Sequence, residues 1–356
     1  MMVQETSFAH KLLPQSPPLA WLLVDAQKTG TLRQAEGLIR GLGLAAKTFL
    51  VKPRGAWPLV PRRFWTANSF CDGPDTPFRA LLAKEPPVML MGAGTTGSAA
   101  VAALGRLCSH EVFKVALMNP RLPLDRFNAV VAPCHDRLKG SQVISTVLSP
   151  HAVTLPQVKK EVERFRAAFA PVPLPRLGVL LGGSAHRFRL NVAFAQKLGR
   201  DLRHIHLRTG AGFLLTPSRR TSATSLAALK DALGNTPHFM WDGSGDNPYH
   251  AILGASDYLM VTGDSVQMLS EAAATTAPLY VYDAPGLPAR LKGFHSLLYQ
   301  QNLARPFRGY LEAWLRPAVH PNDMLVKALR SRLEQTHPHI LDQLKLFQMT
   351  QRSRAL

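Results

Sequence analysis

The sequence predicts an α/β protein made of two Rossmann-like, doubly wound domains that face each other across a cleft. Three observations predict this fold. Short apolar runs alternate with helical patterns, the alternation stops at a proline-rich segment and then restarts, and the 356 residues exceed the usual size of one domain. Apolar runs separated by helices are typical of parallel sheets that are covered on both faces.

The first half of the chain carries the first set of alternating elements. Strands are expected at 20–24, 48–51, 88–91, 115–118 and 129–132, with intervening helices that include 32–41 and 97–107. A charged amphipathic helix at 159–170 leads into the segment PVPLPR at 171–176, whose prolines cannot continue a helix. We therefore expect an amino-terminal domain over residues 1–172.

The same alternation returns after the proline-rich segment. Strands are expected at 177–181, 212–215, 238–241, 258–261 and 279–282, with helices at 188–202 and 226–233. These elements predict a second domain over residues 173–320. Residues 321–356 read as a long amphipathic helix, interrupted at Pro338, that we expect to pack back on the first domain.

The charge balance is strongly basic, with 42 Lys and Arg residues against 23 Asp and Glu residues and a net charge of +19. Such a surplus favours an anionic partner, either a membrane surface or a phosphorylated substrate. Because the basic residues are spread along the chain, we do not expect a nucleic-acid partner. A generally basic, solvated surface without a specific partner is the alternative.

Cysteine usage and hydropathy bound the cellular location. Cys71, Cys108 and Cys134 are widely spaced without a CxxC pair, which argues against a disulfide framework or a structural zinc site. The amino terminus lacks the pattern of a signal peptide, and no apolar run is long enough for a transmembrane segment. We expect a cytoplasmic protein that can rest on the inner face of a membrane.

Two loops of the second domain are candidates for phosphate binding. LLGGSAHRFRL at 180–190 places glycines between a strand and a helix, where the backbone can approach an anion. TPSRRTS at 216–222 places arginines and hydroxyls before the next helix. The alternatives are a tight turn and a helix capped by Thr221 or Ser222. The candidate residues are Gly182, Gly183, Ser184, His186, Arg187, Ser218, Arg219, Arg220 and Thr221.

A third stretch, 242–283, is the most informative. Its TGDS sequence opens a helix that Asp264 or Ser265 could cap, and Asp264 with Gln267 fits a capping box. Gln267 and Glu271 share a helix face, and a carboxylate there can accept two hydrogen bonds from a ribose diol. The alternative for Glu271 is a solvated helix residue. Asn247 and Met268 of the same stretch complete the predicted donor site.

The amino-terminal domain offers candidates for a general base. Asp25, His135 and Asp136 lie at the ends of predicted strands, where ligands of open α/β sheets bind. Each of these residues could equally be structural. The chain contains no DxD triplet, so we expect a mechanism without a metal and without a cofactor.

These stretches resemble a known family. The matching segments are VDAQKTGTLRQAEGL, NPRLPLDRFNAVVAPCHD, LLGGSAHRFRL, SRRTS and GDNPYHAILGASDYLMVTGDSVQMLSEAAATTAPLYVYD. They are similar to bacterial members of the mitochondrial-fission "elongated mitochondria" family, which in turn resembles glycosyltransferases with two Rossmann domains, the GT-B type. The resemblance implies that Gly182, Gly183 and Ser265 hold a donor diphosphate and that Glu271 holds its ribose.

The expected function is that of a glycosyltransferase-like protein. It would bind a nucleotide-diphosphate sugar as substrate and use an anionic envelope or lipid-linked acceptor. One alternative is a non-catalytic adaptor on membranes, as the resemblance to the mitochondrial-fission family suggests. A second alternative is a nucleotide-sugar epimerase on the same scaffold.

Overall fold

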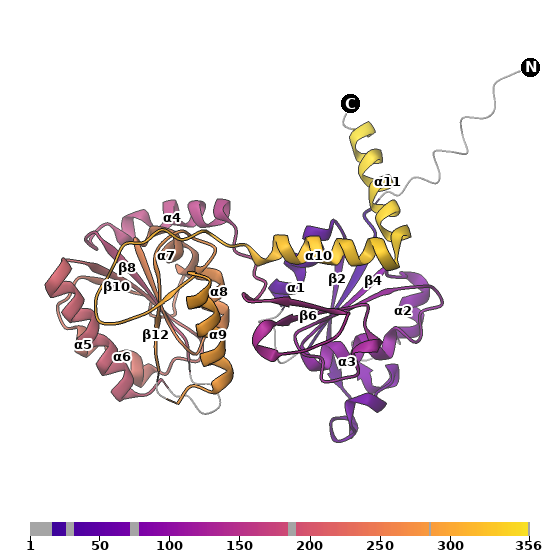
Figure 1. Ribbon diagram of the computed structural model, residues 1–356, viewed down its shortest axis with the longest axis horizontal. Coiled ribbons are helices and arrows are strands. Elements are labelled where there is room, and N and C mark those ends of the chain that lie inside the picture. Colours follow the sequence, from indigo (N-terminus) through magenta and orange to yellow (C-terminus); the bar gives the residue numbers. More distant parts are fainter. Residues whose placement is uncertain (1–15, 26–31, 72–77, 184–189, 285, 355–356) are drawn as a thin grey trace, which may run out of the picture. The chain divides into compact units, whose positions relative to one another are not determined.

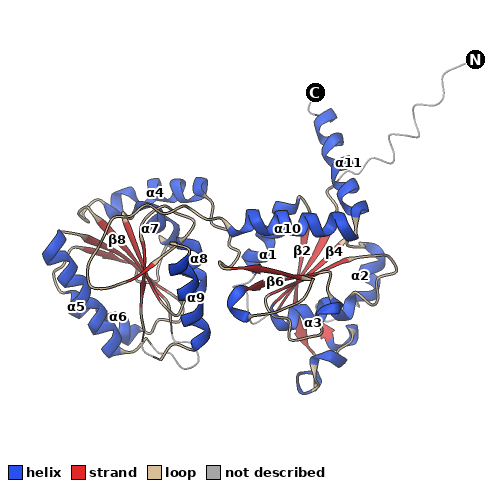
Figure 2. Cartoon of the chain, viewed as in Figure 1, coloured by secondary structure: helices blue, strands red, loops and turns tan. Residues whose placement is uncertain are grey.

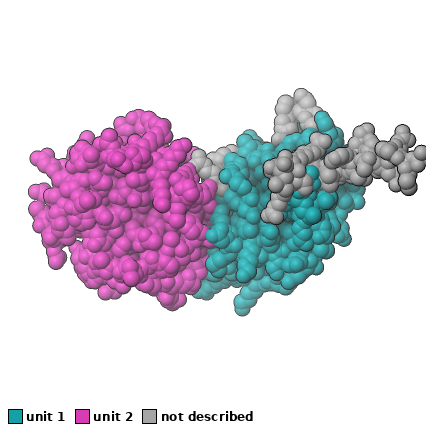
Figure 3. Space-filling model, turned by 90° about the horizontal axis from the view of Figure 1, so that it is seen from above, with its two compact units in different colours: residues 1–146, 321–356 teal, residues 147–320 magenta. Residues whose placement is uncertain are grey.

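The computed structural model describes residues 16–25, 32–71, 78–183, 190–284 and 286–354. The chain divides into two compact units, shown in teal and magenta in Figure 3. Unit 1 consists of Met1–Thr146 together with Pro321–Leu356, and unit 2 is Val147–His320.

The division between the units corrects the boundary expected at residues 172 and 173. Helix α4 (Leu155–Phe169) belongs to unit 2, where Val158 and Phe169 lie in the hydrophobic core. The helix lies so close to α7 (Tyr249–Ala255) that a Cβ at Gly254 would come within 2.4 Å of the Val158 side chain. The proline-rich segment is therefore a turn inside unit 2, between α4 and the first strand of its sheet.

Unit 1 is a seven-stranded sheet in the order β3-β2-β1-β4-β5-β6-β7, with helices on both faces (Figure 2). β2 and β3 pair antiparallel at one edge, and the other pairings are parallel. The strands are β1 (Leu19–Asp25), β2 (Ala45–Pro53), β3 (Phe70–Cys71), β4 (Met89–Ala93), β5 (Phe113–Leu117), β6 (Ala129–Pro133) and β7 (Val143–Thr146). The helices are α1 (Leu32–Leu42), α2 (Phe78–Lys84), α3 (Gly94–Leu104), α10 (Pro321–Thr336) and α11 (Pro338–Arg354), with short 3₁₀ turns η3 (Trp57–Leu59), η4 (Arg62–Phe64), η5 (Ala67–Ser69), η6 (Leu124–Arg126) and η7 (Cys134–Asp136).

Unit 2 repeats this winding with a six-stranded parallel sheet in the order β10-β9-β8-β11-β12-β13. Its strands are β8 (Arg176–Leu181), β9 (Gly212–Pro217), β10 (His238–Met240), β11 (Tyr258–Thr262), β12 (Leu279–Tyr282) and β13 (Arg305–Pro306). Besides α4 and α7, its helices are α5 (Val192–Thr209), α6 (Ala223–Leu233), α8 (Val266–Ala272) and α9 (Ala289–Gln300). The predicted fold class, α/β with two Rossmann-like doubly wound domains, is confirmed.

The apolar runs become central strands because both of their faces are covered. All five residues of β4 and five of the six residues of β8 are buried. Each sheet has one core on each face, so a side chain pointing either way leaves water. This explains why near-continuous apolar sequence, rather than alternation, marks these strands.

The end of the chain returns to unit 1. Leu325, Leu329 and Leu333 of α10 recur every four residues and are buried in the same core as α1. Figure 1 shows α10 in yellow along the side of the sheet that α1 covers. Residues 321–354 form two helices, since α10 ends at Thr336 and α11 begins at Pro338. The interruption expected at this proline is therefore observed.

An irregular segment of unit 2, residues 307–320, is held by a buried arginine. Arg316 is 5% exposed and donates to the carbonyl oxygens of Ala272 (2.8 Å) and Ala277 (2.6 Å) and to Thr275 Oγ1 (3.2 Å). A guanidinium placed there satisfies carbonyls at the end of α8 and matches the negative end of the helix. Arg316 therefore fixes the carboxyl end of α8, the helix that carries Glu271.

Two glycines in helices of unit 2 should respond oppositely to alanine. At Gly199 of α5 a Cβ would lie 2.5 Å from the Ala232 Cβ of α6, whereas at Gly293 of α9 it would meet nothing within 4 Å. We expect Gly199→Ala to lower the free energy of unfolding by about 1–3 kcal/mol through overpacking. Gly293→Ala should raise it by about 0.5–1 kcal/mol, since alanine favours the helix. Urea unfolding measures both free energies, which can be compared when the variants keep the m value of the wild type. Two changes of the same sign would contradict the packing described.

Candidate functional site

The candidate site of unit 2 lies at the point in its parallel sheet where the order of the strands reverses. β8 sits between β9 and β11, so the chain winds one way from β8 and the other way from β11. Ligands of open α/β sheets bind at the carboxyl ends of the strands at such a switch point. The loop after β8 begins with Gly182 and Gly183, and the loop after β11 carries Asp264 and Ser265.

A buried hydrogen-bond network ties these two loops together. The Gly182 amide donates to Thr262 Oγ1 at 2.8 Å, and the Gly183 amide donates to Asp264 Oδ2 at 2.9 Å. The Thr262 hydroxyl in turn donates to Asp264 Oδ1 at 2.7 Å. Thr262, at the end of an apolar strand, was not among the predicted site residues, although a hydroxyl at the carboxyl end of a central strand was the available signal.

The two glycines are required by close contact with neighbouring loops. A Cβ at Gly182 would lie 2.2 Å from the Asp264 carboxylate, and a Cβ at Gly183 would lie 2.3 Å from the Arg220 Cβ and 2.6 Å from its backbone. Their amides are engaged by Thr262 and Asp264, so these glycines act through loop packing. Ser184, His186 and Arg187 of the same predicted motif lie outside the described residues.

Asp264 is a buried carboxylate, 8% exposed. Burial raises its pKa, and the hydrogen bonds from Thr262 and Gly183 partly oppose that rise. Asp264 is not the cap of α8, and the expected capping box with Gln267 is wrong. Ser265 is the N-cap and accepts from the Met268 amide at 3.3 Å, because the Asp264 carboxylate points back to the β8 loop.

The loop between β9 and α6 joins the same cluster. Thr221 Oγ1 donates to the Gly182 carbonyl oxygen at 2.7 Å and accepts from the Ser218 amide at 3.0 Å. The Arg220 amide donates to Ser218 Oγ at 3.2 Å, while the side chains of Arg219 and Arg220 are exposed. Of the two expected caps of α6, Ser222 is the one observed. Three predicted loops thus meet, and two guanidinium groups remain in solvent beside them.

Glu271 on α8 is held by two donors. Its Oε2 accepts from the Tyr249 hydroxyl at 2.5 Å and its Oε1 accepts from Gln267 Nε2 at 2.8 Å. Burial first, and then the Glu271 charge, raise the pKa of Tyr249 well above its usual value, so the phenol remains a donor. Asn247 accepts from the Tyr249 amide at 3.0 Å in an exposed turn, and Met268 packs partly buried against the core. Tyr249 was not predicted, since nothing local in its sequence reveals a partner on another helix.

The three base candidates of unit 1 lie at two separate positions along the carboxyl ends of its strands. Asp25 is the last residue of β1, and its Oδ2 accepts from the Thr96 hydroxyl at 2.9 Å. His135 and Asp136 lie in turn η7 after β6, with 3.9 Å between Nε2 and Oδ1, and their side chains are 4% and 8% exposed. β4 and β5 lie between β1 and β6, about 14 Å at ordinary strand spacing. Asp25 and the His135–Asp136 pair are therefore alternatives rather than one catalytic group.

No group of three His, Cys, Asp or Glu residues that could hold a metal ion occurs within the described part of the chain. Searching the same residues finds no helix with the length and apolar character needed to cross a membrane.

Comparison with known families decides the relationship. Residues 29–333 match the family model described as Mitochondrial fission ELM1. The chain belongs to this family. The Mitochondrial fission protein ELM1 of Arabidopsis thaliana is 27% identical over 278 residues, which cover 70% of this chain and 64% of that protein. The chain thus matches less than two thirds of that relative's length. The uncharacterized protein RP120 of Rickettsia prowazekii is 26% identical over 265 residues, covering 64% of this chain and 73% of that protein.

Solved structures with the same fold are nucleotide-sugar enzymes. The UDP-GlcNAc 2-epimerase of Methanocaldococcus jannaschii superposes with a TM-score of 0.52 at 14% identity, over 88% of this chain and 92% of that chain. The Neisseria meningitidis UDP-GlcNAc 2-epimerase bound to UDP-GlcNAc gives 0.51 at 12% identity, over 92% and 94%. At such identities the likeness establishes the shared fold, the GT-B-like pairing of two Rossmann-like domains.

The buried Asp264 carboxyl predicts a specific pH dependence. Because its folded pKa is raised, the stability it contributes is present below its unfolded pKa and is lost as pH rises through the folded pKa. Asp264→Asn lacks this titration and can keep one acceptor for Gly183. The free energy of unfolding of the wild type minus that of Asp264→Asn should therefore fall as pH rises above about 4, the ordinary range of an aspartate carboxyl. Urea unfolding across this range tests it, and a difference that grows with pH would contradict the assignment.

Proposed function

We propose that unit 2 binds a nucleotide-diphosphate sugar and that the protein transfers the sugar to an anionic envelope or lipid-linked acceptor. The observation that carries the proposal is the meeting of three loops, after β8, β9 and β11, at the switch point of the sheet. This position is the general ligand site of such sheets. A network of buried hydrogen bonds fixes the loops, so a ligand would meet a site that is already organised.

The ribose would bind to Glu271. Tyr249 and Gln267 donate to its two carboxylate oxygens and so fix the orientation of the group. A carboxylate oxygen can accept more than one hydrogen bond, so a ribose diol could donate to the same carboxylate. This arrangement supports the role because the carboxylate would need no rearrangement on binding.

The diphosphate would be held by Arg219 and Arg220 together with the polar start of α8 at Ser265. Exposed guanidinium groups can form paired hydrogen bonds with phosphate oxygens. These two arginines lie in the loop between β9 and α6, which Thr221 ties to the Gly182 carbonyl, so the backbone that carries them is fixed. Fixed cations of this kind stabilise a departing diphosphate without a metal.

Sugar transfer would need a base for the acceptor hydroxyl. The base takes the hydroxyl proton while the new bond to the sugar forms and the bond to the diphosphate breaks. We propose Asp25 or the His135–Asp136 pair for this step, since both lie at carboxyl ends of strands in unit 1.

An epimerase is the second candidate, and the shared fold with the two UDP-GlcNAc 2-epimerases favours it. An epimerase would convert a nucleotide sugar without an acceptor, whereas a transferase would release nucleoside diphosphate only when an acceptor is present. Product analysis with and without acceptor separates these two activities. An adaptor would show no saturable affinity for nucleoside diphosphates.

Glu271→Ala tests the ribose contact. Loss of hydrogen bonds to a charged group should weaken nucleoside-diphosphate binding roughly ten- to hundredfold, equivalent to about 1.5–3 kcal/mol. A 2′-deoxyribose ligand should bind the wild type poorly and lose little more in this variant. Tyr249→Phe is the companion variant, because it removes a partner that orients Glu271 but keeps the carboxylate, and it should weaken binding less than Glu271→Ala does. Isothermal titration measures each affinity. Wild-type affinity in Glu271→Ala would place the donor elsewhere and favour the adaptor.

Ser265→Ala tests the phosphate contact at the start of α8. It should weaken ribose and deoxyribose ligands alike, since the phosphates are common to both. Loss of the cap should also cost about 1 kcal/mol of stability. Titration with both ligands and urea unfolding measure these effects. A loss confined to the ribose ligand would contradict the assignment of Ser265 to the phosphates.

A further inference from the structure

A basic and apolar segment joins β2 to β3 at the edge of unit 1. Between Lys52 and Cys71 the sequence contains no acidic residue but carries four cations, Lys52, Arg54, Arg62 and Arg63. Within the described part of the chain none of the four pairs with a carboxylate. We call residues 52–71 the edge segment. Its positive charge is therefore directed to solvent.

The edge segment also exposes large apolar side chains. Leu59 is 87% exposed and Phe64 is 56% exposed. The Arg63 guanidinium lies 4.8 Å from the centre of the Phe64 ring, so a cation accompanies an exposed aromatic ring. Exposing apolar side chains of this size to water is unfavourable, and an ordinary solvated loop carries polar side chains instead.

The segment is held in a defined shape. Lys52 and Pro53 pair with Cys71 and Phe70 across its base. Above this pairing, the Val60 amide closes turn η3 by donating to the Trp57 carbonyl at 3.0 Å, and the Trp65 amide closes turn η4 by donating to the Arg62 carbonyl at 3.1 Å. Trp65 Nε1 joins the two turns by donating to the Val60 carbonyl at 2.8 Å. Arg126, from turn η6, donates to the Arg63 carbonyl at 3.2 Å. Leu59 and Phe64 are therefore carried on fixed turns.

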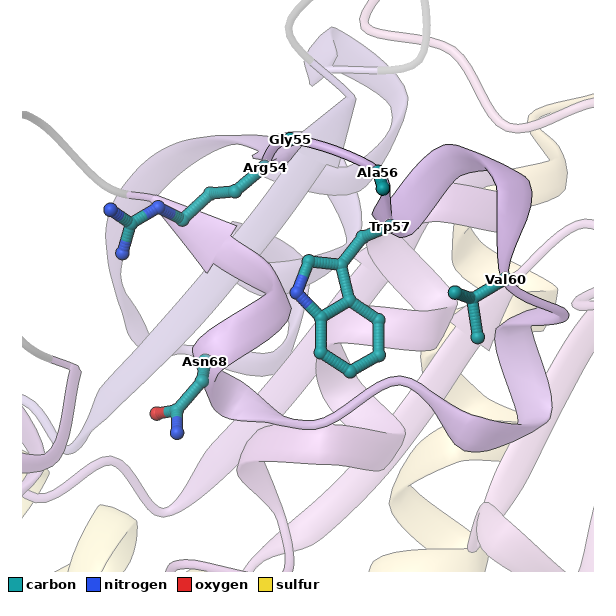
Figure 4. A pocket seen from close by; sticks show the side chains of 6 residues that line it. All are labelled: Arg54, Gly55, Ala56, Trp57, Val60 and Asn68. Atoms are coloured by element: carbon teal, nitrogen blue, oxygen red, sulfur yellow. The ribbon is translucent and has the colours of Figure 1, made fainter.

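A shallow cavity of about 430 Å³ lies in the same segment. Figure 4 shows the Trp57 indole between Val60 on one side and the polar ends of Arg54 and Asn68 on the other. An indole with an apolar neighbour and a nearby cation suits the boundary between hydrocarbon and headgroups, where tryptophan is favoured.

We infer that the edge segment docks unit 1 on an anionic phospholipid bilayer. Leu59 and Phe64 would enter the acyl region, while Arg54, Arg62 and Arg63 would contact lipid phosphates. The inference rests on the proposed function in one respect, because docking on a bilayer would bring the protein to a lipid-linked acceptor.

Charge and shape favour a bilayer over other partners. A second copy of this chain would bring the same four cations against themselves, which is repulsive. A nucleic acid would satisfy the arginines but would offer nothing to an exposed leucine. A bilayer with anionic lipids supplies both an apolar interior and surface phosphates.

Vesicle sedimentation tests the inference with the full chain and without nucleotide. The probes are vesicles of phosphatidylcholine alone and vesicles in which a third of the lipid is phosphatidylglycerol. The wild type should bind the anionic vesicles, and binding should weaken as salt screens the cations. Leu59→Ser with Phe64→Ser should reduce binding at least about tenfold, since two apolar side chains no longer gain from leaving water. Arg62→Gln with Arg63→Gln should reduce it on the order of tenfold, with the loss shrinking in high salt.

Matched controls lie in unit 2. Leu207 and Leu315 are 73% and 96% exposed, so Leu207→Ser with Leu315→Ser removes comparable apolar surface. Arg203 and Arg208 are exposed on α5, so Arg203→Gln with Arg208→Gln makes the same change in net charge. Both controls should bind anionic vesicles within about twofold of the wild type. Circular dichroism and urea unfolding confirm that each variant is folded.

Three outcomes would overturn the inference. They are wild-type binding by Leu59→Ser with Phe64→Ser, an equal loss in the unit 2 controls, and equal binding of the wild type to both kinds of vesicle. Conversion of a wild-type dimer to a monomer by the edge variant, with vesicle binding unchanged, would make the segment a self-association surface instead. Nucleoside-diphosphate titration of the same variants separates the two proposals. A failure of the donor site leaves the vesicle result standing, and a failure of docking leaves the nucleotide affinity unchanged.

Discussion

The buried carboxylate of Asp264 is the interaction on which the arrangement of unit 2 depends most. It accepts from the Gly183 amide and the Thr262 hydroxyl, and so binds the loop after β8 to the loop after β11. These loops are far apart in the sequence but adjacent in the sheet, where β8 and β11 pair. An ionised group in this place is costly unless its hydrogen bonds are made. The same bonds that offset its burial thus fix the backbone that the β9 loop also contacts, through Thr221 and the Gly182 carbonyl.

Close backbone approach is the complementary constraint in unit 1. A Cβ at Gly97 of α3 would lie 2.2 Å from the Leu23 carbonyl oxygen, so α3 can lie against β1 only because this position has no side chain. The contact brings Thr96 to Asp25 across the switch point between β1 and β4. Both units therefore join a threonine hydroxyl to an aspartate where their sheets reverse. In unit 1 Asp25 ends β1 and Thr96 lies in α3, whereas in unit 2 Thr262 ends β11 and Asp264 follows it.

The two units divide their chemistry in the proposed function. Unit 2 presents a carboxylate fixed from behind and guanidinium groups on an anchored loop, which suits a nucleotide diphosphate. Unit 1 presents carboxylate and imidazole groups at strand ends and, on the edge beyond β2, exposed cations and exposed apolar side chains. Four cations of this basic chain gather in the edge segment, which contains no acidic residue.

The sequence by itself determined the repeated α/β winding, since central strands buried on both faces must be apolar throughout. It also placed the glycine, arginine and serine positions at strand ends. The short edge strands β3, β7 and β13 were not predicted, because two to four residues with mixed burial carry no periodic signal. Only the tertiary structure decided that α4 belongs to unit 2, that Ser265 rather than Asp264 caps α8, and that Thr262 and Tyr249 complete the site. Each of these depends on a partner distant in sequence, and a local pattern cannot show which group a polar side chain will meet once the sheet has formed.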